Sequence, residues 1–126
     1  RALFIISSEL DFPANREAPI AARLSFRDSG GLVVNAEFDW RQTGPQSWDI
    51  IVTTAGGEVR LANGGARLWI NGAEQTLEKE AEYPSLYQRF ADIIRAGKSD
   101  VDVAPLRHVA DAFMLGQRKV VDAFHD

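Results

Sequence analysis

Apolar and polar side chains alternate along the first third of the chain, which is the pattern of strands with one buried face. Residues 18–27 alternate in this way, and residues 32–41 repeat the alternation after the turn sequence Asp28-Ser29-Gly30-Gly31. The two segments predict an antiparallel hairpin. Residues 2–10, rich in Phe and Ile, predict an earlier strand in which the alternation is less regular.

Short strands are expected in the middle of the chain. Strand-like runs occupy residues 48–54, 58–61, 66–70 and 74–77. Glycine-containing turn sequences separate them, at Ala55-Gly56-Gly57, Asn63-Gly64-Gly65 and Asn71-Gly72. Because such turns join neighbouring antiparallel strands, this part of the chain predicts a meander.

The spacing of apolar residues becomes helical in the last third. Tyr83-Pro84 introduces the first helix and Gly97 ends it. Its apolar stripe contains Leu86, Tyr87, Phe90, Ile93 and Ile94, and we expect Tyr83 and Tyr87 in the core. A second helix begins near Pro105, with an inward stripe of Leu106, Val109, Ala110 and Phe113 that Gly116 ends. Residues 119–121 predict a final short strand.

This order of elements predicts an α+β fold, a mostly antiparallel open sheet with two helices packed on one face. We expect the helical stripes to meet the sheet face that carries Ile20, Leu24, Phe38 and Ile50. The chain has 126 residues, of which 45% are hydrophobic, and this suffices for one domain with one core over residues 1–126.

Residues 39–49 connect the predicted strand at residues 32–41 to the one at residues 48–54. This connection is the leading candidate for a binding surface. Trp40 and Trp48 flank it, and Arg41, Gln42 and Gln46 lie near its tip. Indole faces beside hydrogen-bonding groups suit a polyhydroxylated ligand. The alternative is a loop that packs through its tryptophans without binding anything. Strand parity places both tryptophans on the buried faces of their strands, where they would anchor the loop while the polar residues reach outward.

A second surface is predicted around Trp69. Arg67 and Trp69 share one face of their strand, whereas Leu68 and Ile70 occupy the other. A face that combines an aromatic residue with charges is typical of a subunit or domain interface. We therefore predict an interface at Arg67 and Trp69, and a homo-oligomer.

Composition excludes several classes of function. The 14 basic and 18 acidic residues give a net charge of -4, and the basic residues form no run, which argues against nucleic acid or an anionic membrane as partner. The absence of cysteine excludes disulfides, thiolate nucleophiles and zinc–cysteine sites, and favours a cytoplasmic protein. No apolar run approaches the roughly 20 residues that span a bilayer.

The chain contains binding groups but no evident catalytic group. His108 and His125 lie too far apart in sequence for a metal site, and both are interpreted as structural or solvated. Glu78, Glu80 and Glu82 are interpreted as a solvated acidic stretch that favours the following helix N-terminus. The glycine pairs do not match the dinucleotide-binding pattern. We assign no catalytic residue, no metal ligand and no cofactor ligand to this chain.

Four segments resemble a known family. They are residues 14–23 (ANREAPIAAR), 38–49 with FDWRQTGPQ and Trp48-Asp49, 82–87 with Glu82-Tyr83-Pro84, and 105–113 with Pro105-Leu106-Arg107. They resemble the C-terminal half of the galactose 1-dehydrogenases, within the glucose-fructose oxidoreductase/inositol dehydrogenase (Gfo/Idh/MocA) superfamily. The resemblance covers almost the whole chain, and Trp-Arg-Gln-Thr-Gly-Pro-Gln is its most specific part.

The resemblance implies a larger parent enzyme. An N-terminal Rossmann domain, absent from this chain, would bind NAD or NADP, and hydride would pass from the anomeric carbon of an aldose to nicotinamide, giving an aldonolactone. The family's catalytic lysine would precede Arg1. Residues 1–126 would form the substrate-binding and oligomerisation domain, with sugar contacts from Trp40, Arg41, Gln42, Gln46 and Trp48 and an interface on the open sheet face. This fragment alone is predicted to be inactive.

Two further expectations concern the chain as a whole. It opens in a strand-like run without an initiator methionine, so we expect a fragment or a processed product. The alternative function is a non-catalytic sugar sensor or scaffold that has kept the fold and lost the catalytic lysine. The sequence does not choose among aldoses such as galactose, arabinose and fucose, because hydroxyl contacts read their stereochemistry.

Overall fold

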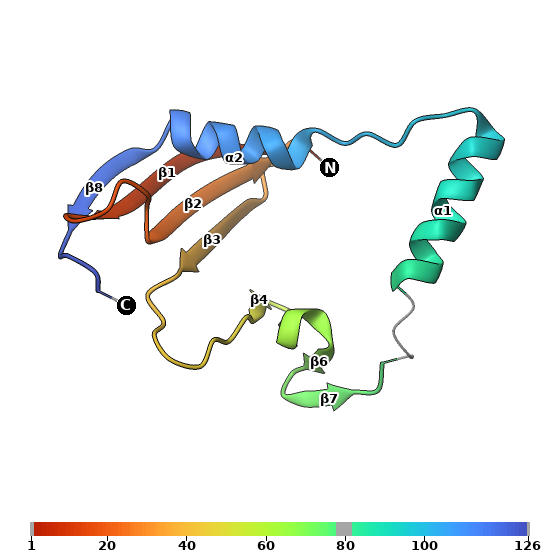
Figure 1. Cartoon of the computed structure of the whole chain (residues 1–126), viewed down its shortest axis with the longest axis horizontal. Helices are drawn as coiled ribbons and strands as arrows, with labels where there is room; N and C mark the ends of the chain where they lie inside the picture. Colours follow the sequence, from red (N-terminus) through yellow and green to blue (C-terminus); the bar gives the residue numbers. More distant parts are fainter. Residues whose placement is uncertain (1, 78–81, 126) are drawn as a thin grey trace. The chain divides into compact units, whose positions relative to one another are not determined.

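The strands of this protein form two sheets. In the computed structural model (Figure 1), which describes residues 2–77 and 82–125, each sheet has four strands, in the orders β3-β2-β1-β8 and β4-β5-β6-β7. The chain divides into two compact units, one of residues 1–44 with 101–126 and one of residues 45–100. The predicted α+β class is confirmed, with two helices and largely antiparallel open sheets.

The first unit contains the predicted hairpin. Its strands are β1 (Leu3–Pro13), β2 (Ala21–Asp28), β3 (Val33–Asp39) and β8 (Gln117–Val121). β1, β2 and β3 pair antiparallel, and β8 pairs parallel to β1. At the β2–β3 turn, Asp28 accepts hydrogen bonds of 2.8 Å from the backbone of Gly30 and of Leu32. The aspartate side chain therefore fixes the turn that sets the register of the hairpin.

Helix α2 (Ala104–Met114) covers one face of this sheet, as the blue helix in Figure 1 shows. Leu10 and Ala22 are buried beneath it, and Ser8 donates a 2.7 Å hydrogen bond to the carbonyl of Ala112. Gly116 connects α2 to β8. A Cβ there would lie 2.4 Å from the Ala112 oxygen and 2.9 Å from Cδ1 of Leu10. Only glycine lets the chain pass so close to the core at this point.

The second unit contains the predicted meander. Its strands are β4 (Ile50–Thr54), β5 (Gly57–Ala62), β6 (Arg67–Ile70) and β7 (Ala73–Gln75), with the short 3₁₀ turn η1 (Asn63–Gly65) between β5 and β6. All neighbouring strands are antiparallel. Asn71, with a positive φ of 51°, turns β6 into β7 and accepts a 2.8 Å hydrogen bond from the backbone of Glu58. Among the described residues of this unit, Ala62 alone is buried.

Helix α1 (Glu82–Ala96) also belongs to the second unit, and none of its residues is buried. Tyr83 and Tyr87 are 67% and 70% exposed, so the prediction that they lie in the core is wrong for this chain. The physical reason is that no described residue of the unit covers the apolar stripe of α1. The expected common face is also divided, because Ile50 belongs to the second sheet while Leu24 and Phe38 belong to the first.

Two further observations concern the acidic residues near α1 and the length and polarity of both helices. Glu82 lies in the first turn of α1, where a carboxylate favours the helix dipole, whereas Glu78 and Glu80 lie outside the described residues. Within residues 2–77 and 82–125, neither helix has the length and apolar character needed to cross a membrane.

Candidate functional site

Two segments that carry the family resemblance meet at one end of the first sheet. The backbone N–H of Trp40 donates to the carbonyl of Ile20 at 3.0 Å, and the N–H of Ile20 donates to the carbonyl of Asp11 at 2.8 Å. These bonds extend the ladder past the end of β3. We call this region the loop end, and define it by Asp11, Ile20, Asp39, Trp40 and Arg41.

The C-terminal segment is tied to the same end of the sheet. The side-chain amide of Asn15 donates to the carbonyl of Phe124 at 2.8 Å and accepts from its N–H at 3.0 Å. The N–H of Ala14 donates to the carbonyl of Val121 at 3.0 Å. The β1–β2 connection, which carries residues 14–19, is therefore held in place beside the loop end.

Trp40 projects from the apolar side of the loop end. Its ring stacks on Phe38, with centroids 6.0 Å apart and planes inclined by 10°. It lines an apolar cavity of about 500 Å³ between α2 and the first sheet. Leu24, Phe26, Val109 and Phe113 also line this cavity. Trp40 lies on the apolar side, as strand parity predicted, but the prediction that it is buried is wrong, because the residue is 58% exposed. It is therefore available to a ligand or another part of the protein.

Arg41 projects to the opposite, polar side. Its Nε lies 3.1 and 3.0 Å from the two carboxylate oxygens of Asp39, and its Nη2 lies 2.8 Å from Oδ2. The N–H of Arg41 also donates to Oδ1 at 2.8 Å. Consecutive residues of an extended chain point to opposite faces, so a ligand that contacts both Trp40 and Arg41 has to lie across the end of β3.

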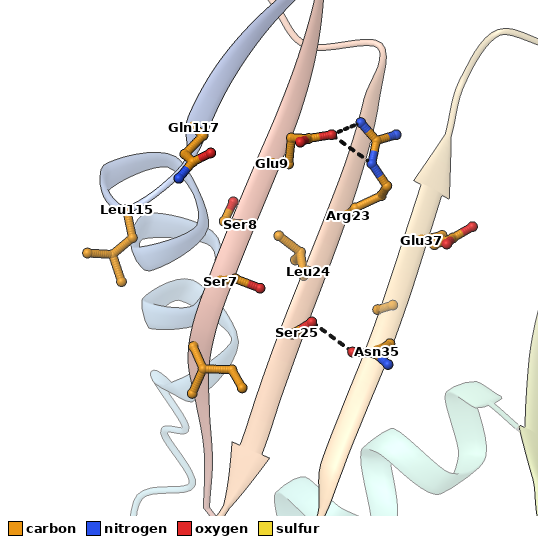
Figure 2. Close-up of a pocket in the computed structure, with 12 residues that line it drawn as sticks. Ser7, Ser8, Glu9, Arg23, Leu24, Ser25, Asn35, Glu37, Leu115 and Gln117 are labelled. Carbon is orange, nitrogen blue, oxygen red and sulfur yellow. Dashed lines mark hydrogen bonds and ion pairs between the residues drawn. The ribbon is translucent and has the colours of Figure 1, made fainter.

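An ion network extends from Arg41 across the polar face of the first sheet. Arg23 binds both oxygens of Asp11, at 2.7 and 3.2 Å, and also pairs with Glu9, as Figure 2 shows for Glu9. Nη2 of Arg41 lies 3.9 Å from Asp11. Asp11 is almost fully buried, and its hydrogen bonds to Arg23 hold the pKa of its carboxyl below the ordinary value. The hydrogen bonds of Arg41 likewise lower the pKa of Asp39.

A groove of about 650 Å³ with a mixed polar and apolar lining lies beside the network. Figure 2 shows its lining side chains on β1, β2 and β3, including Arg23, Glu37 and the pair in which Ser25 donates to Asn35 at 2.7 Å. Sequence reasoning identified neither the groove nor Asp11. Alternation placed Arg23 and Glu37 on one face, but only the strand register brings Glu9 beside Arg23.

The other predicted sugar-contact residues fall on both sides of the unit boundary. Gln42 belongs to the first unit, whereas Gln46 and Trp48 belong to the second. The ring of Trp48 lies against Gly64, where a Cβ would be 3.5 Å from Cε3, and it is 71% exposed rather than buried. The five residues therefore do not belong to one compact unit, and their common role stays a prediction.

Arg67 and Trp69 belong to a row of paired side chains on the second sheet, which we call the Trp69 ladder. Its members are Asp49, Arg60, Arg67, Trp69 and Glu74. The guanidinium carbons of Arg67 and Arg60 lie 4.6 and 5.4 Å from the centre of the Trp69 ring. Glu74 pairs with Arg67 at 2.8 Å, and Asp49 pairs with Arg60 at 2.6 Å. Sequence reasoning missed Arg60, which the antiparallel register places directly opposite Trp69. The ladder holds Trp69 between two cations on an exposed sheet face.

The histidine at α2 has a structural role. Nε2 of His108 lies 3.0 Å from the carbonyl oxygen of Leu3, and its ring packs edge-on against Phe26 at 5.6 Å. It faces the sheet, not the polar flank of the helix, because this contact anchors α2 to the start of β1. In the described part of the chain, no three metal-ligating side chains of the His, Cys, Asp and Glu type come together.

Comparisons with known proteins identify the relatives of this chain. No protein-family model matches it. The curated galactose 1-dehydrogenase of Pseudomonas fluorescens is 46% identical over 124 residues, which is 98% of this chain and 41% of that protein. The crystal structure of D-galactose-1-dehydrogenase from Rhizobium etli is 66% identical, with a TM-score of 0.78 over 99% of this chain and 40% of that one. The chain is similar, over nearly its whole length, to a segment of these two galactose 1-dehydrogenases.

The chain thus spans about two fifths of the length of the galactose 1-dehydrogenases that it matches. The resemblance to galactose 1-dehydrogenases, which four segments of the sequence carry, is confirmed. Because identity extends over nearly the whole chain, both sheets and both helices belong to the shared region. The loop end and the Trp69 ladder are accordingly parts of a galactose 1-dehydrogenase-like segment.

Proposed function

We propose that this chain is the substrate-binding and oligomerisation domain of a cytoplasmic NAD(P)-dependent aldose 1-dehydrogenase of the Gfo/Idh/MocA superfamily, with D-galactose as first candidate substrate. The observation that carries the proposal is the identity, over nearly the whole chain, to two proteins named galactose 1-dehydrogenase. The catalytic groups and the Rossmann domain would belong to the remainder of the parent enzyme.

We propose that the nicotinamide cofactor binds outside this chain. Glycines with positive φ, such as Gly31, Gly57 and Gly72, lie in turns between strands, not between a strand and a helix N-terminus where a pyrophosphate binds. We therefore assign the binding of NAD or NADP to the remainder of the parent enzyme. The role of this chain is to bind and orient the sugar.

The loop end supplies the groups for that role. The exposed ring of Trp40 offers an apolar face to the C–H side of a pyranose, and Arg41 offers N–H donors to its hydroxyls. Gln42 belongs to the same unit and is a further candidate contact, whereas the sugar contacts of Gln46 and Trp48, in the second unit, stay a prediction. A sugar across the end of β3 would meet the apolar side at Trp40 and the polar side at Arg41, which matches the two-sided character of a sugar ring.

The experiment that tests this function uses the full-length protein. Purified enzyme is given D-galactose, L-arabinose or D-fucose with NAD or NADP, and reduced nicotinamide is followed by absorbance. We expect turnover with at least one aldose. Galactose binding in calorimetry without any turnover would instead favour the non-catalytic sensor, and the absence of both would contradict the sugar-binding role.

The subunit interface is a second part of the proposal. The Trp69 ladder combines a half-buried indole with exposed, ion-paired arginines, which suits a contact between copies. We expect Trp69→Ala to dissociate the full-length oligomer in sedimentation velocity. The matched control is Arg95→Ala, which breaks an exposed pair with Asp92 on α1 outside the ladder. A wild-type protein that remains monomeric at high concentration would contradict the interface.

A further inference from the structure

We propose that Asp39 is a positioning residue, which holds the guanidinium of Arg41 in place and compensates its charge. As a result, the loop end binds neutral hydroxyl groups and does not bind anions. The inference rests on the proposed sugar-binding function and concerns the Arg41 side of that site. Asp39 therefore holds Arg41 in place and does not itself contact the sugar.

The geometry of the pair supports this division of roles. Oδ1 of Asp39 accepts from the backbone N–H of Arg41 at 2.8 Å and from its Nε at 3.1 Å. Oδ2 lies 3.0 Å from Nε and 2.8 Å from Nη2. A carboxylate has about four lone-pair positions, and three N–H groups of Arg41 point at them, with the Nε–H shared between the two oxygens. Asp39 has little capacity left to accept a hydrogen bond from a sugar hydroxyl.

The same pairing leaves one edge of the guanidinium available. Arg41 has donors on Nε, Nη1 and Nη2, of which Nε and Nη2 face Asp39. Nη1 makes no hydrogen bond or ion pair within the described residues. An arginine held along one edge presents the opposite edge in a fixed direction, which lowers the entropy lost when a ligand binds.

The charge of the surroundings decides the class of ligand. The ion pairs of the polar face join three carboxylates to three cations, because Lys119 lies 4.0 Å from Glu9 in addition to the pairs of Arg23 and Arg41. Glu37, opposite Arg23 in the register, adds a fourth carboxylate to the same face and so makes it no more attractive to anions. The lowered pKa of Asp39 keeps it ionised at neutral pH. The network is therefore neutral, and Arg41 attracts an anion far less than an unpaired arginine would. A neutral polyol fits this site better than a phosphorylated sugar.

The test compares Asp39→Asn, Arg41→Ala and the double variant in the full-length protein. Asparagine keeps the volume of Asp39 and an acceptor for the Arg41 backbone N–H, so the fold is retained. Loss of one charge-assisted contact corresponds to roughly tenfold in affinity. We expect Asp39→Asn to raise the KM for galactose about tenfold, with kcat changed less than about threefold. Because Arg41 gains an uncompensated charge, inorganic phosphate should become a several-fold stronger competitive inhibitor.

The double variant separates support from direct contact. If Asp39 acts through Arg41, the double variant matches Arg41→Ala in both KM and phosphate inhibition. Additive losses, or phosphate inhibition unchanged by Asp39→Asn, would overturn the inference. The matched control is Asp100→Asn in the second unit, because Asp100 pairs with Nε and Nη2 of Arg89 at 2.9 and 2.7 Å and not with a residue of the loop end. This control should leave KM and phosphate inhibition unchanged.

Galactose dissociation constants from calorimetry are measured on the same variants. An enzyme that binds galactose without turnover would contradict the dehydrogenase function. The coupling between Asp39 and Arg41 would still follow from the galactose dissociation constants of the single and double variants. An active wild-type enzyme with additive variants would contradict the inference alone. Absence of both binding and turnover would contradict both.

Discussion

The two sheets of this protein have the same number of strands but differ in how their apolar faces are covered. In the first sheet, α2 lies over Leu10 and Ala22, both buried. In the second sheet, the apolar face that carries Ile50, Val52 and Ile70 is exposed, and α1 buries none of its own residues. The difference indicates that the first sheet has a core of its own, whereas the second depends on surfaces outside its unit.

The comparison matters for function, because the loop end belongs to the covered sheet. A binding group is effective only when its support is rigid. Arg41 is held by Asp39 and lies near the buried Asp11, and Trp40 continues the ladder of β3. The Trp69 ladder, by contrast, lies on a sheet with little core, which suits a surface completed by a partner.

The largest expected effect comes from the core of the first sheet. Leu10→Ala removes a side chain that is 4% exposed and should lower the free energy of unfolding by about 2–5 kcal/mol. Val52→Ala in the second sheet, where the residue is 50% exposed, should cost less than about 1 kcal/mol. Urea unfolding of the 126-residue chain, in which these exposures apply, measures both, and equal losses would contradict the difference between the sheets.

A glycine substitution tests the close approach at the end of α2. Gly116→Ala places a Cβ against the backbone oxygen of Ala112, and should cost about 1–3 kcal/mol. Gly56→Ala in the second unit is the matched control, because the new Cβ would meet only Oγ1 of Thr54, at 3.6 Å. We expect that control to remain within about 0.5 kcal/mol in the same urea titration. A neutral Gly116→Ala would show that the α2–β8 junction is not tightly packed.

The smallest expected effect at neutral pH is the contribution of Asp11 to pH dependence. Its pKa is lower in the folded protein than in the unfolded chain, so the stabilisation is present above the unfolded pKa and is lost as the pH falls through the folded pKa. The unfolding temperature should therefore drop below about pH 4. Asp11→Asn should be less stable at pH 7 and should show a weaker acid dependence. An identical acid dependence would assign the effect to other carboxylates.

Sequence alone predicted most of the elements. The β2–β3 hairpin followed from strict alternation and the turn at Asp28. A final short strand was predicted at residues 119–121, but its parallel pairing with β1 was not. The exposure of Tyr83 and Tyr87 could not be predicted, because helical spacing shows that a stripe exists but not what covers it. For the same reason, the division into two sheets was not foreseen.

The candidate site was predicted in part. The residues of the Trp40–Trp48 segment were identified from their chemistry, and alternation alone places Trp40 and Arg41 on opposite faces. Asp39 and Arg41 are only two residues apart, so their pairing could have been predicted from the Asp-x-Arg spacing. The approach of Asp11 to Arg41 depends on the register of three strands, which no single segment of sequence specifies.

The most direct test of the account is a crystal structure of the full-length protein with D-galactose and its nicotinamide cofactor. We predict a sugar hydroxyl about 3 Å from Nη1 of Arg41, with the apolar side of the pyranose against the ring of Trp40. Asp39 should keep its contacts to Nε and Nη2 of Arg41. A galactose molecule bound away from both Trp40 and Arg41 would contradict the assignment of the loop end as the sugar-binding surface.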